Sequence, residues 1–392
     1  MCRRFRVVSQ RPPRDAYPRY RRPTMKARGV HLQYHFDRQP QQGDALHNPL
    51  FDLLSALHEQ GSIQHAAKAL GASYRHVWGE LKRWEEQLGE PLVTWAQGRP
   101  ARLTPLADRL LWAERQARAR LAPHIEALRA ELSHVLAQAL DGTQQVLSLT
   151  ASHDLALPRL AERAAADHGL HLELRFAGSM DALRALAENR CAVAGFHVPP
   201  LADARHGFAR ALKPLLKPGQ HKLIGCMQRR QGLMVAPRNP LTVAGLADLA
   251  RLRFANRQPG SGTRLLAEHL LAREGLDPAA ISGFNQAPEH SHLAAATAVA
   301  SGHADAALGI EAAAAQLGLD FVPLVEEDYF LVCLKDLLEH PAVVRTREVL
   351  ASPAWPALLA TLPGYAPHPQ AGQVLSLTRA LPWWNFRSQR VR

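Results

Sequence analysis

The spacing of apolar residues changes once along this chain of 392 residues, and that change constrains the fold more than any other feature. From residue 48 to residue 140 apolar residues recur every three or four positions, which is typical of amphipathic helices. From residue 146 onward, short strand-like runs alternate with helical stretches rich in alanine and leucine. The sequence therefore predicts a helical amino-terminal module followed by an α/β region with largely parallel sheets.

Three short helices are predicted between residues 48 and 93. Gly61 and Gly71 are placed to end the first two helices, and a serine follows each break. Such tight breaks indicate a helix-turn-helix, in which the third helix would present its polar side chains to the major groove of DNA. The candidate DNA contacts in these helices are Ser62, Ser73, Tyr74, Arg75, His76, Lys82 and Arg83.

The segment that follows, PLVTWAQGRPARLT, predicts two short β segments around the turn at residues 97–100. This pattern is typical of a wing, and Arg99 and Arg102 lie at or near its tip as further candidate DNA contacts. Thr104 and Pro105 then predict the N-cap and the first residue of another helix.

That next helix, up to residue 140, carries a possible dimer seam. Its apolar residues step by 4, 3, 4 and 3, which is coiled-coil spacing. Proteins that bind two-fold symmetric DNA sites need a dimer contact, so we expect a homodimer or a dimer of dimers. Pro123 lies inside the run and predicts a kink or a division into two helices. The seam residues are Leu121, Ile125, Leu128, Leu132 and Val135.

Positive charge is concentrated at the start of the chain. The whole sequence carries a formal charge of +12, and residues 1–24 alone hold eight arginines against Asp15. A proline-containing segment without periodicity predicts a disordered arm that touches DNA phosphates. The alternative is that Met25 is the true start of the protein.

The α/β region ends several of its predicted strands in small polar residues. Ligands of such folds settle beyond the carboxyl ends of strands, where helix amino termini point inward. The turn Gly260-Ser261-Gly262-Thr263-Arg264, before a helix, has the free N–H groups, hydroxyls and adjacent guanidinium of an anion nest. The predicted strands span residues 146–152, 170–179, 192–198, 222–227, 232–237, 253–256, 306–310 and 328–334.

Other chemistries find little support in the sequence. The four cysteines form no C-x-x-C pair, which argues against disulfides and zinc fingers and favours a reducing cytoplasm. His290 and His292 lack further metal ligands at recognisable spacing, so we expect a surface loop and no metal. Neither a nucleophile elbow nor a P-loop lysine is present, and no apolar run is long enough to span a membrane. We therefore expect no enzyme, no cofactor and no membrane partner.

Two stretches resemble known families. The segment GSIQHAAKALGASYRHVWGELKRWEEQLGEPLV resembles the winged helix-turn-helix of the molybdate-responsive (ModE-like) regulators, relatives of the LysR type, over residues 48–120. The strings GLMVAPRNP, RFANRQPGSGTR and HLAAATAVASGHADAALGIEAAA resemble the periplasmic-binding-protein-like domain fused to such modules, over residues 145–345. The second resemblance implies a bilobed type II fold that closes over a tetrahedral oxyanion, with molybdate or tungstate as the first candidates.

The resemblance also implies a set of ligand-binding positions. His153 and His197 depart from a purely neutral set of donors, so formate, another carboxylate or another oxyanion stays open as the ligand. The candidate ligand-binding residues are Ser152, His153, Ser179, His197, Ser261, Gly262, Thr263, Arg264, Ser291 and Tyr329.

Together these features predict a cytoplasmic, ligand-responsive transcriptional regulator that binds double-stranded DNA and a small anion. A cytoplasmic solute-binding protein is the less favoured alternative. The expected parts are a basic arm (1–45), a winged helix-turn-helix (46–104), a linker or dimerisation helix (105–142), a two-lobed sensing domain (143–367) and a tail (368–392).

Overall fold

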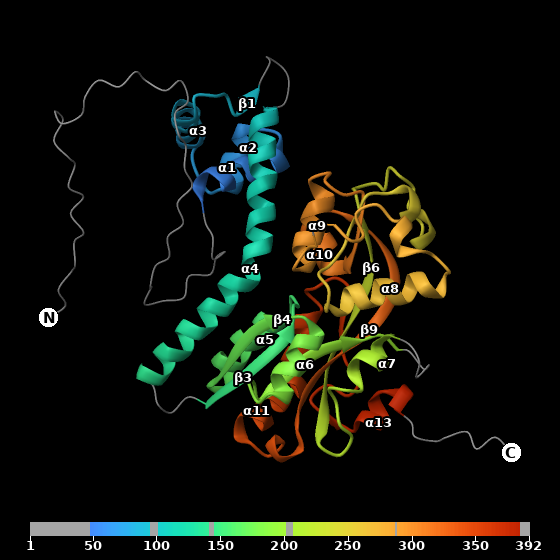
Figure 1. Cartoon of the computed structure of the whole chain (residues 1–392). Coiled ribbons are helices and arrows are strands. Elements are labelled where there is room, and N and C mark those ends of the chain that lie inside the picture. Colours follow the sequence, from blue (N-terminus) through green and yellow to red (C-terminus); the bar gives the residue numbers. More distant parts are fainter. Residues whose placement is uncertain (1–47, 95–100, 141–144, 201–206, 287, 385–392) are drawn as a thin grey trace, which may run out of the picture. The chain divides into compact units, whose positions relative to one another are not determined.

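The computed structural model describes residues 48–94, 101–140, 145–200, 207–286 and 288–384. The expected basic arm lies outside the described residues, and the domain boundaries stay predictions. No helix among the described residues is both long and apolar enough to cross a bilayer. Figure 1 shows the helices and strands coloured along the chain.

The amino-terminal module consists of helices α1 (Pro49–Gln60), α2 (Ile63–Ala69) and α3 (Tyr74–Leu88). Gly61 ends α1 in the left-handed conformation that glycine adopts without strain. Ser73 caps α3 by accepting a hydrogen bond from the His76 N–H at 3.2 Å, as predicted. Ser62 holds the N-cap position of α2 without a side-chain hydrogen bond to the helix. The three helices share one apolar core, which includes Leu54, Ile63, Ala66, Val77 and Leu81.

Strands β1 (Val93–Thr94) and β2 (Arg102–Leu103) form the antiparallel pair of the predicted wing. The turn between them, with Arg99, lies outside the described residues. Thr104 caps the following helix, as predicted, by accepting from the Ala107 N–H at 3.2 Å.

Helix α4 (Pro105–Leu140) runs unbroken through position 123, so of the two predicted outcomes, a kink or a division into two helices, the division is wrong. Figure 1 shows that the helix changes direction about midway. A proline removes one backbone donor from a helix, and the carbonyl four residues earlier loses its partner. That carbonyl, of Ala119, accepts a hydrogen bond from the Ser291 hydroxyl at 3.1 Å instead.

The carboxyl-terminal region is built on one nine-stranded sheet whose main path runs β4-β3-β5-β9-β6-β8-β7. The strands are β3 (Gln145–Ser152), β4 (Leu170–Ala177), β5 (Val193–Val198), β6 (His221–Val235), β7 (Phe254–Ala255), β8 (Ala306–Ile310), β9 (Asp320–Leu334), β10 (Tyr365–Pro367) and β11 (Val374–Leu375). The helices are α5 (Leu157–His168), α6 (Ser179–Ala187), α7 (Gly207–Leu212), α8 (Gly262–Arg273), α9 (His292–Ala300), α10 (Glu311–Gln316), α11 (Pro341–Ala351), α12 (Ala354–Leu359) and α13 (Leu377–Ala380).

The sheet is mixed, so the expectation of largely parallel strands is wrong. Strands β6 and β9 are 15 residues each, and they pair antiparallel along their whole length. The sequence suggested two strands in place of β6 because polar residues 228–231 interrupt its apolar runs. Arg229 and Gln231 are nevertheless buried, and both bond to Glu327 of β9. Pairing of these polar side chains across the ladder allows the strand to continue.

The two long strands join two groups of shorter strands. Strand β9 pairs with β5, which continues through β3 to β4, by its residues 328–333. Strand β6 pairs with β8, and so with β7, by its residues 231–235. This arrangement agrees with the α/β class expected of the sensing domain, although not with largely parallel strands.

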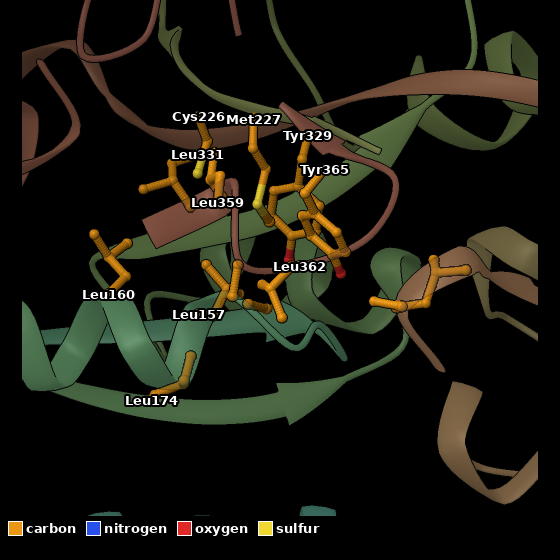
Figure 2. Packing of buried hydrophobic residues seen from close by; sticks show 14 of the residues in the cluster. Leu157, Leu160, Leu174, Cys226, Met227, Tyr329, Leu331, Leu359, Leu362 and Tyr365 are labelled. Carbon is orange, nitrogen blue, oxygen red and sulfur yellow. The ribbon is translucent and has the colours of Figure 1, made fainter. Parts of the chain in front are cut away.

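Two apolar cores cover the two faces of the sheet, because successive residues of a strand point to opposite sides. Val193 belongs to one core and its neighbour Ala194 to the other. Helices α5, α9, α10 and α11 pack into the first core, and α6, α7 and α8 into the second. Figure 2 shows part of the first core, where Leu157 and Leu160 of α5 lie against residues such as Leu331 of the sheet. The tryptophans at 383 and 384 are buried in the second core.

Candidate functional site

Helix α3 presents a polar surface opposite its buried residues Val77 and Leu81. Ser73, Tyr74, Arg75 and His76 are exposed at its amino-terminal end, and Tyr74 exposes 52% of its surface. This is the end of a recognition helix that contacts base edges in helix-turn-helix complexes.

Two turns further along, α3 carries two more basic residues. Lys82 pairs with Glu85 at 2.7 Å, and Arg83 pairs with Glu80. Exposed ion pairs of this kind contribute little to stability, so a DNA phosphate can replace the carboxylate at small cost. Arg102 in β2 is also exposed, whereas Arg99 lies outside the described residues.

Gly79 lies at the centre of the exposed face of α3, one turn after Arg75. A Cβ added there would meet no atom within 4 Å. Glycine inside a helix costs roughly 0.5–1 kcal/mol relative to alanine, and no neighbour among the described residues explains its presence.

A small pocket lies between the two groups of strands. One wall comes from the ends of β3 and β5 and the start of α6, and the other from the segment after β7 and the starts of α8 and α9. The lining residues are Ser152, His153, Ala177, Gly178, Ser179, His197, Arg257, Ser261, Gly262, Thr263 and His292.

Three helix amino termini meet at this pocket. Ser179 begins α6, Gly262 begins α8 and His292 begins α9. The free N–H groups and the dipole of a helix favour a negative charge at its amino terminus. Gly262 also permits a close approach between α8 and His197, because an added Cβ would overlap the imidazole.

Six polar side-chain atoms of the lining residues are buried without a hydrogen-bond partner among the described residues. Buried polar groups are nearly always paired in folded proteins, so a cluster of unpaired ones indicates a place for a ligand or water. The atoms are Nδ1 of His153, Oγ of Ser179, Nε2 of His197, Nη1 of Arg257, Oγ1 of Thr263 and Nδ1 of His292.

The charge in this pocket comes from Arg257. Burial, followed by the nearby Arg229, lowers the pKa of Arg257 to about 9. Because this value is still above 7, the guanidinium is protonated at neutral pH. Burial, followed by the two arginines, lowers the pKa of His153 to about 3. The same causes hold the pKa values of His197 and His292 well below the usual range. The pocket therefore combines one cation with three neutral imidazoles.

The proton on His197 can be placed from its partners. Nη2 of Arg229 lies 2.9 Å from Nδ1 of His197, and a guanidinium only donates. Nδ1 is therefore the acceptor, and the neutral ring carries its proton on Nε2. The nearby carboxylate oxygen of Glu327 is 3.8 Å from Nε2, too far for a hydrogen bond. Nε2–H is left as a donor at the pocket.

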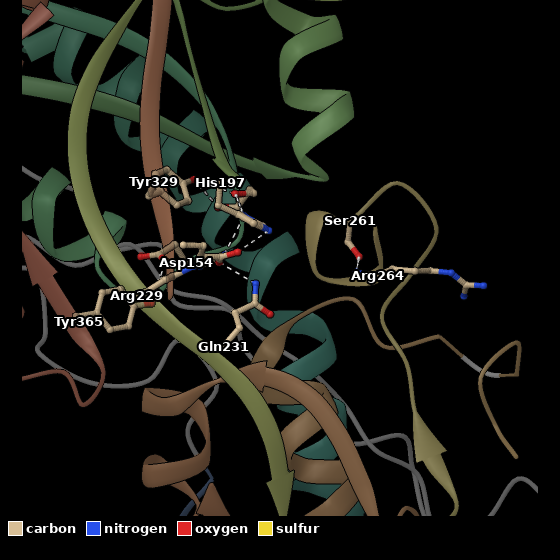
Figure 3. Close-up of polar contacts among 10 residues, drawn as sticks. Asp154, His197, Arg229, Gln231, Ser261, Arg264, Tyr329 and Tyr365 are labelled. Carbon is tan, nitrogen blue, oxygen red and sulfur yellow. Dashed lines mark hydrogen bonds and ion pairs between the residues drawn. The ribbon is translucent and has the colours of Figure 1, made fainter. Parts of the chain in front are cut away.

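A buried ion cluster lies behind His197, as Figure 3 shows. Arg229 bonds Asp154 at 2.5 Å and Glu327 at 2.6 Å, and all three side chains are fully buried. Burial works against the charge on Arg229, but the two carboxylates raise its pKa above the usual value. Tyr365 donates a further hydrogen bond to Asp154 at 2.8 Å. The cluster fixes the position of His197 through Arg229.

The structure brings most of the expected ligand-binding residues together and separates three of them. The pocket is lined by Ser152, His153, Ser179, His197, Ser261, Gly262 and Thr263. Arg264 bonds Glu268 and Asn285 instead, and Figure 3 shows it directed away from His197. Tyr329 lies behind the pocket and donates to the Ser152 carbonyl at 2.9 Å. Ser291 contacts α4.

Two lining residues with polar side chains, Arg257 and His292, were not predicted from the sequence. Arg257 lies two residues after strand β7, so its place near a strand end could have indicated it. His292 was expected in a surface loop, but it is buried as the first residue of α9. Among the described residues, no group of three or more His, Cys, Asp or Glu side chains could hold a metal ion.

Comparisons with known proteins identify both halves. Residues 50–108 match the family described as "Bacterial regulatory helix-turn-helix protein, lysR family", and residues 160–351 match the "PBP superfamily domain". The chain is thus a LysR-family helix-turn-helix joined to a PBP-superfamily domain. LysR-type transcriptional regulators are not enzymes, which agrees with the expectation from the sequence.

Individual relatives add detail. The chain is 34% identical over 195 residues to the uncharacterised protein YvgK of Bacillus subtilis, covering 49% of this chain and 61% of that protein. It is 37% identical over 102 residues to an uncharacterised protein from the 5′ region of a 2Fe-2S ferredoxin gene of Clostridium pasteurianum, covering 26% of this chain and 88% of that protein. The solved structure of CbnR, a LysR family transcriptional regulator, is 16% identical with a TM-score of 0.38, covering 76% of this chain and 98% of that one.

Proposed function

We propose that this LysR-type protein is a DNA-binding transcriptional regulator whose PBP-superfamily domain senses a small oxyanion. The observation that carries the proposal is the pocket itself, where three helix amino termini, one buried guanidinium and six unpaired polar atoms meet. Such a site offers charge-assisted hydrogen bonds to an anion without a fully compensating countercharge.

Molybdate and tungstate are the first candidate effectors, since donors from both walls surround the pocket and a tetrahedral anion accepts from all sides. Formate or another small carboxylate is the alternative, because a single guanidinium also suits a planar monoanion. ModE-type specificity belongs to this proposal and rests on the sequence resemblance alone.

DNA and a second copy of the chain are the proposed partners. The exposed start of α3 would enter the major groove, and the seam on α4 would join two copies as a homodimer or a dimer of dimers. Three seam residues of α4 are exposed in the single chain: Leu121 by 37%, Leu128 by 49% and Val135 by 58%. A protein with these partners would act in the cytoplasm. A solute-binding protein, the alternative, would have no use for a helix-turn-helix.

Two measurements test the proposal. The purified protein should bind duplex DNA from upstream of its own gene, with an affinity that falls steeply as salt rises. Its melting temperature should rise with at least one of molybdate, tungstate, sulfate, formate and acetate. Failure to bind DNA would refute the regulator, and a flat melting temperature across all five anions would refute the oxyanion pocket.

A further inference from the structure

Residues 289–292 contact the pocket on one side and helix α4 on the other. His292 lines the pocket, whereas Glu289 and Ser291 bond α4. Glu289 and Ser291 expose 3% and 1% of their surfaces, whereas the Arg120 side chain that meets Glu289 is 46% exposed. One short segment thus touches both the proposed effector site and α4, the helix that follows the amino-terminal module.

The contact from Glu289 is a two-point ion pair with Arg120. Nε of Arg120 donates to Oε2 at 3.0 Å, and Nη2 donates to Oε1 at 2.8 Å. Gln116, one turn earlier on α4, lies 3.5 Å from Oε1. Paired guanidinium and carboxylate groups of this geometry fix orientation as well as distance.

The contact from Ser291 uses a carbonyl that the helix itself does not satisfy. Its hydroxyl donates to the Ala119 carbonyl, which has no helical donor because residue 123 is proline. The same hydroxyl accepts from the Ala294 N–H at 3.0 Å and so caps α9, the helix that begins with His292 at the pocket. A movement of the start of α9 would therefore act on α4.

Arg257 connects the pocket to this segment through a single guanidinium. Its Nε donates to the Glu289 carbonyl at 3.1 Å, and its Nη2 donates to the His290 carbonyl at 3.2 Å. Its Nη1 has no hydrogen-bond partner in the part of the chain that the structure describes, and Arg257 lines the pocket. An anion bound at Nη1 would share its donor group with the backbone of residues 289 and 290.

We propose that residues 289–292 transmit effector binding from the pocket to α4, with the Arg120–Glu289 ion pair as the decisive contact. The proposal rests on the function proposed above. Ala107 and Leu111 of α4 are buried in the core of the amino-terminal module, so a rotation or shift of α4 moves that module with it. By linkage, the anion changes DNA affinity only if it favours one arrangement of this contact over another.

The test compares Arg120→Gln, Glu289→Gln and the double variant with the wild-type full-length protein. Affinity for upstream duplex DNA is measured without anion and with saturating molybdate, tungstate or formate, whichever raises the wild-type melting temperature. Arg163→Gln is the control, because the Arg163 side chain is 49% exposed, close to the 46% of Arg120, and it pairs with Asp167 within α5 instead of with residues 289–292. Melting temperatures with and without the same anion report whether the pocket still binds it.

Each single variant should still bind DNA and still be stabilised by the anion, but the factor by which the anion changes DNA affinity should fall to about one. The double variant should lose no more than either single one, since both remove the same contact. Arg163→Gln should keep the wild-type factor. If Arg120→Gln and Glu289→Gln also keep it, the transmission proposal is overturned while the proposed function stands. If the anion does not change the DNA affinity of the wild type, the transmission proposal and the proposed function both fail.

Discussion

At the scale of single residues, the pocket depends on Arg257, the charged group among its lining residues. Arg257→Gln should weaken binding of the stabilising anion by about tenfold or more, because a hydrogen bond to a charged group contributes about 1.5–3 kcal/mol. The measurement is the anion concentration needed for half of the rise in melting temperature. Arg264→Gln is the control, since Arg264 is engaged with Glu268 and Asn285 and should leave that concentration unchanged. If Arg257→Gln and Arg264→Gln weakened anion binding equally, the anion would bind outside this pocket.

The sequence indicated most of the pocket because its residues lie where strands end and helices begin. Ser152 and Ser179 follow this rule, and so does the turn around Ser261. The choice between Arg257 and Arg264 was not available from the sequence, since both flank the same turn and only the direction of each side chain separates them. His292 was missed because an H-x-H pattern does not reveal that its second histidine is buried at a helix start.

Gly79 supports a second prediction at this scale. Gly79→Ala should raise the free energy of unfolding by roughly 0.5–1 kcal/mol, because alanine is the better helix former and the added methyl group meets open space. The same methyl group would stand between α3 and DNA, and we expect affinity for upstream duplex DNA to fall by about fivefold, or ~1 kcal/mol. Urea denaturation and fluorescence anisotropy measure the two effects. A variant that is more stable and binds DNA equally well would show that α3 does not approach DNA through this face.

At the scale of elements, α4 offers an apolar seam that the single chain leaves partly exposed. Leu128→Glu should convert a dimer into monomers, because it places a charge inside a coiled-coil contact. Sedimentation velocity measures the change. Leu241→Glu is the matched control, since Leu241 is 41% exposed outside α4 and its replacement should leave the dimer intact. A dimer that survives Leu128→Glu would place the contact on another surface.

Elements with a simple apolar period were predictable, and those with buried polar residues were not. Helices α1 to α3 and strands β3, β5 and β8 follow from spacing alone. Strand β6 contains Arg229 and Gln231 in its interior, and only their pairing with Glu327 across the ladder makes a continuous strand stable. Helix α4 continues past Pro123 for a similar reason, because a partner distant in sequence replaces the missing hydrogen bond.

At the scale of the whole molecule, the buried histidines make stability depend on pH. The pKa of His153 is about 3 in the folded chain, and those of His197 and His292 are also lowered by burial, against about 6.5 when unfolded. Below pH 6.5 the unfolded chain binds more protons, so their contribution is complete above that pH and is lost as the pH falls. The free energy of unfolding should drop between pH 6.5 and 5.5 by up to about 1 kcal/mol per histidine.

Urea denaturation at pH 7.5, 6.5 and 5.5 measures this dependence. His292→Gln should make the loss between pH 6.5 and 5.5 smaller, because one of the three groups no longer titrates. A free energy of unfolding that stays constant or rises on acidification would mean that these imidazoles are not held neutral in the folded protein.

The central claim is that a small anion in the pocket alters how the whole molecule binds DNA. The most direct test is fluorescence anisotropy of labelled upstream duplex DNA, titrated with the full-length protein at fixed salt with and without the anion that raises its melting temperature. We predict a change in affinity of about 5- to 150-fold for the wild type, the usual range for coupled sites, and its loss in Arg257→Gln. An unchanged affinity at anion concentrations that fully stabilise the protein would contradict the account.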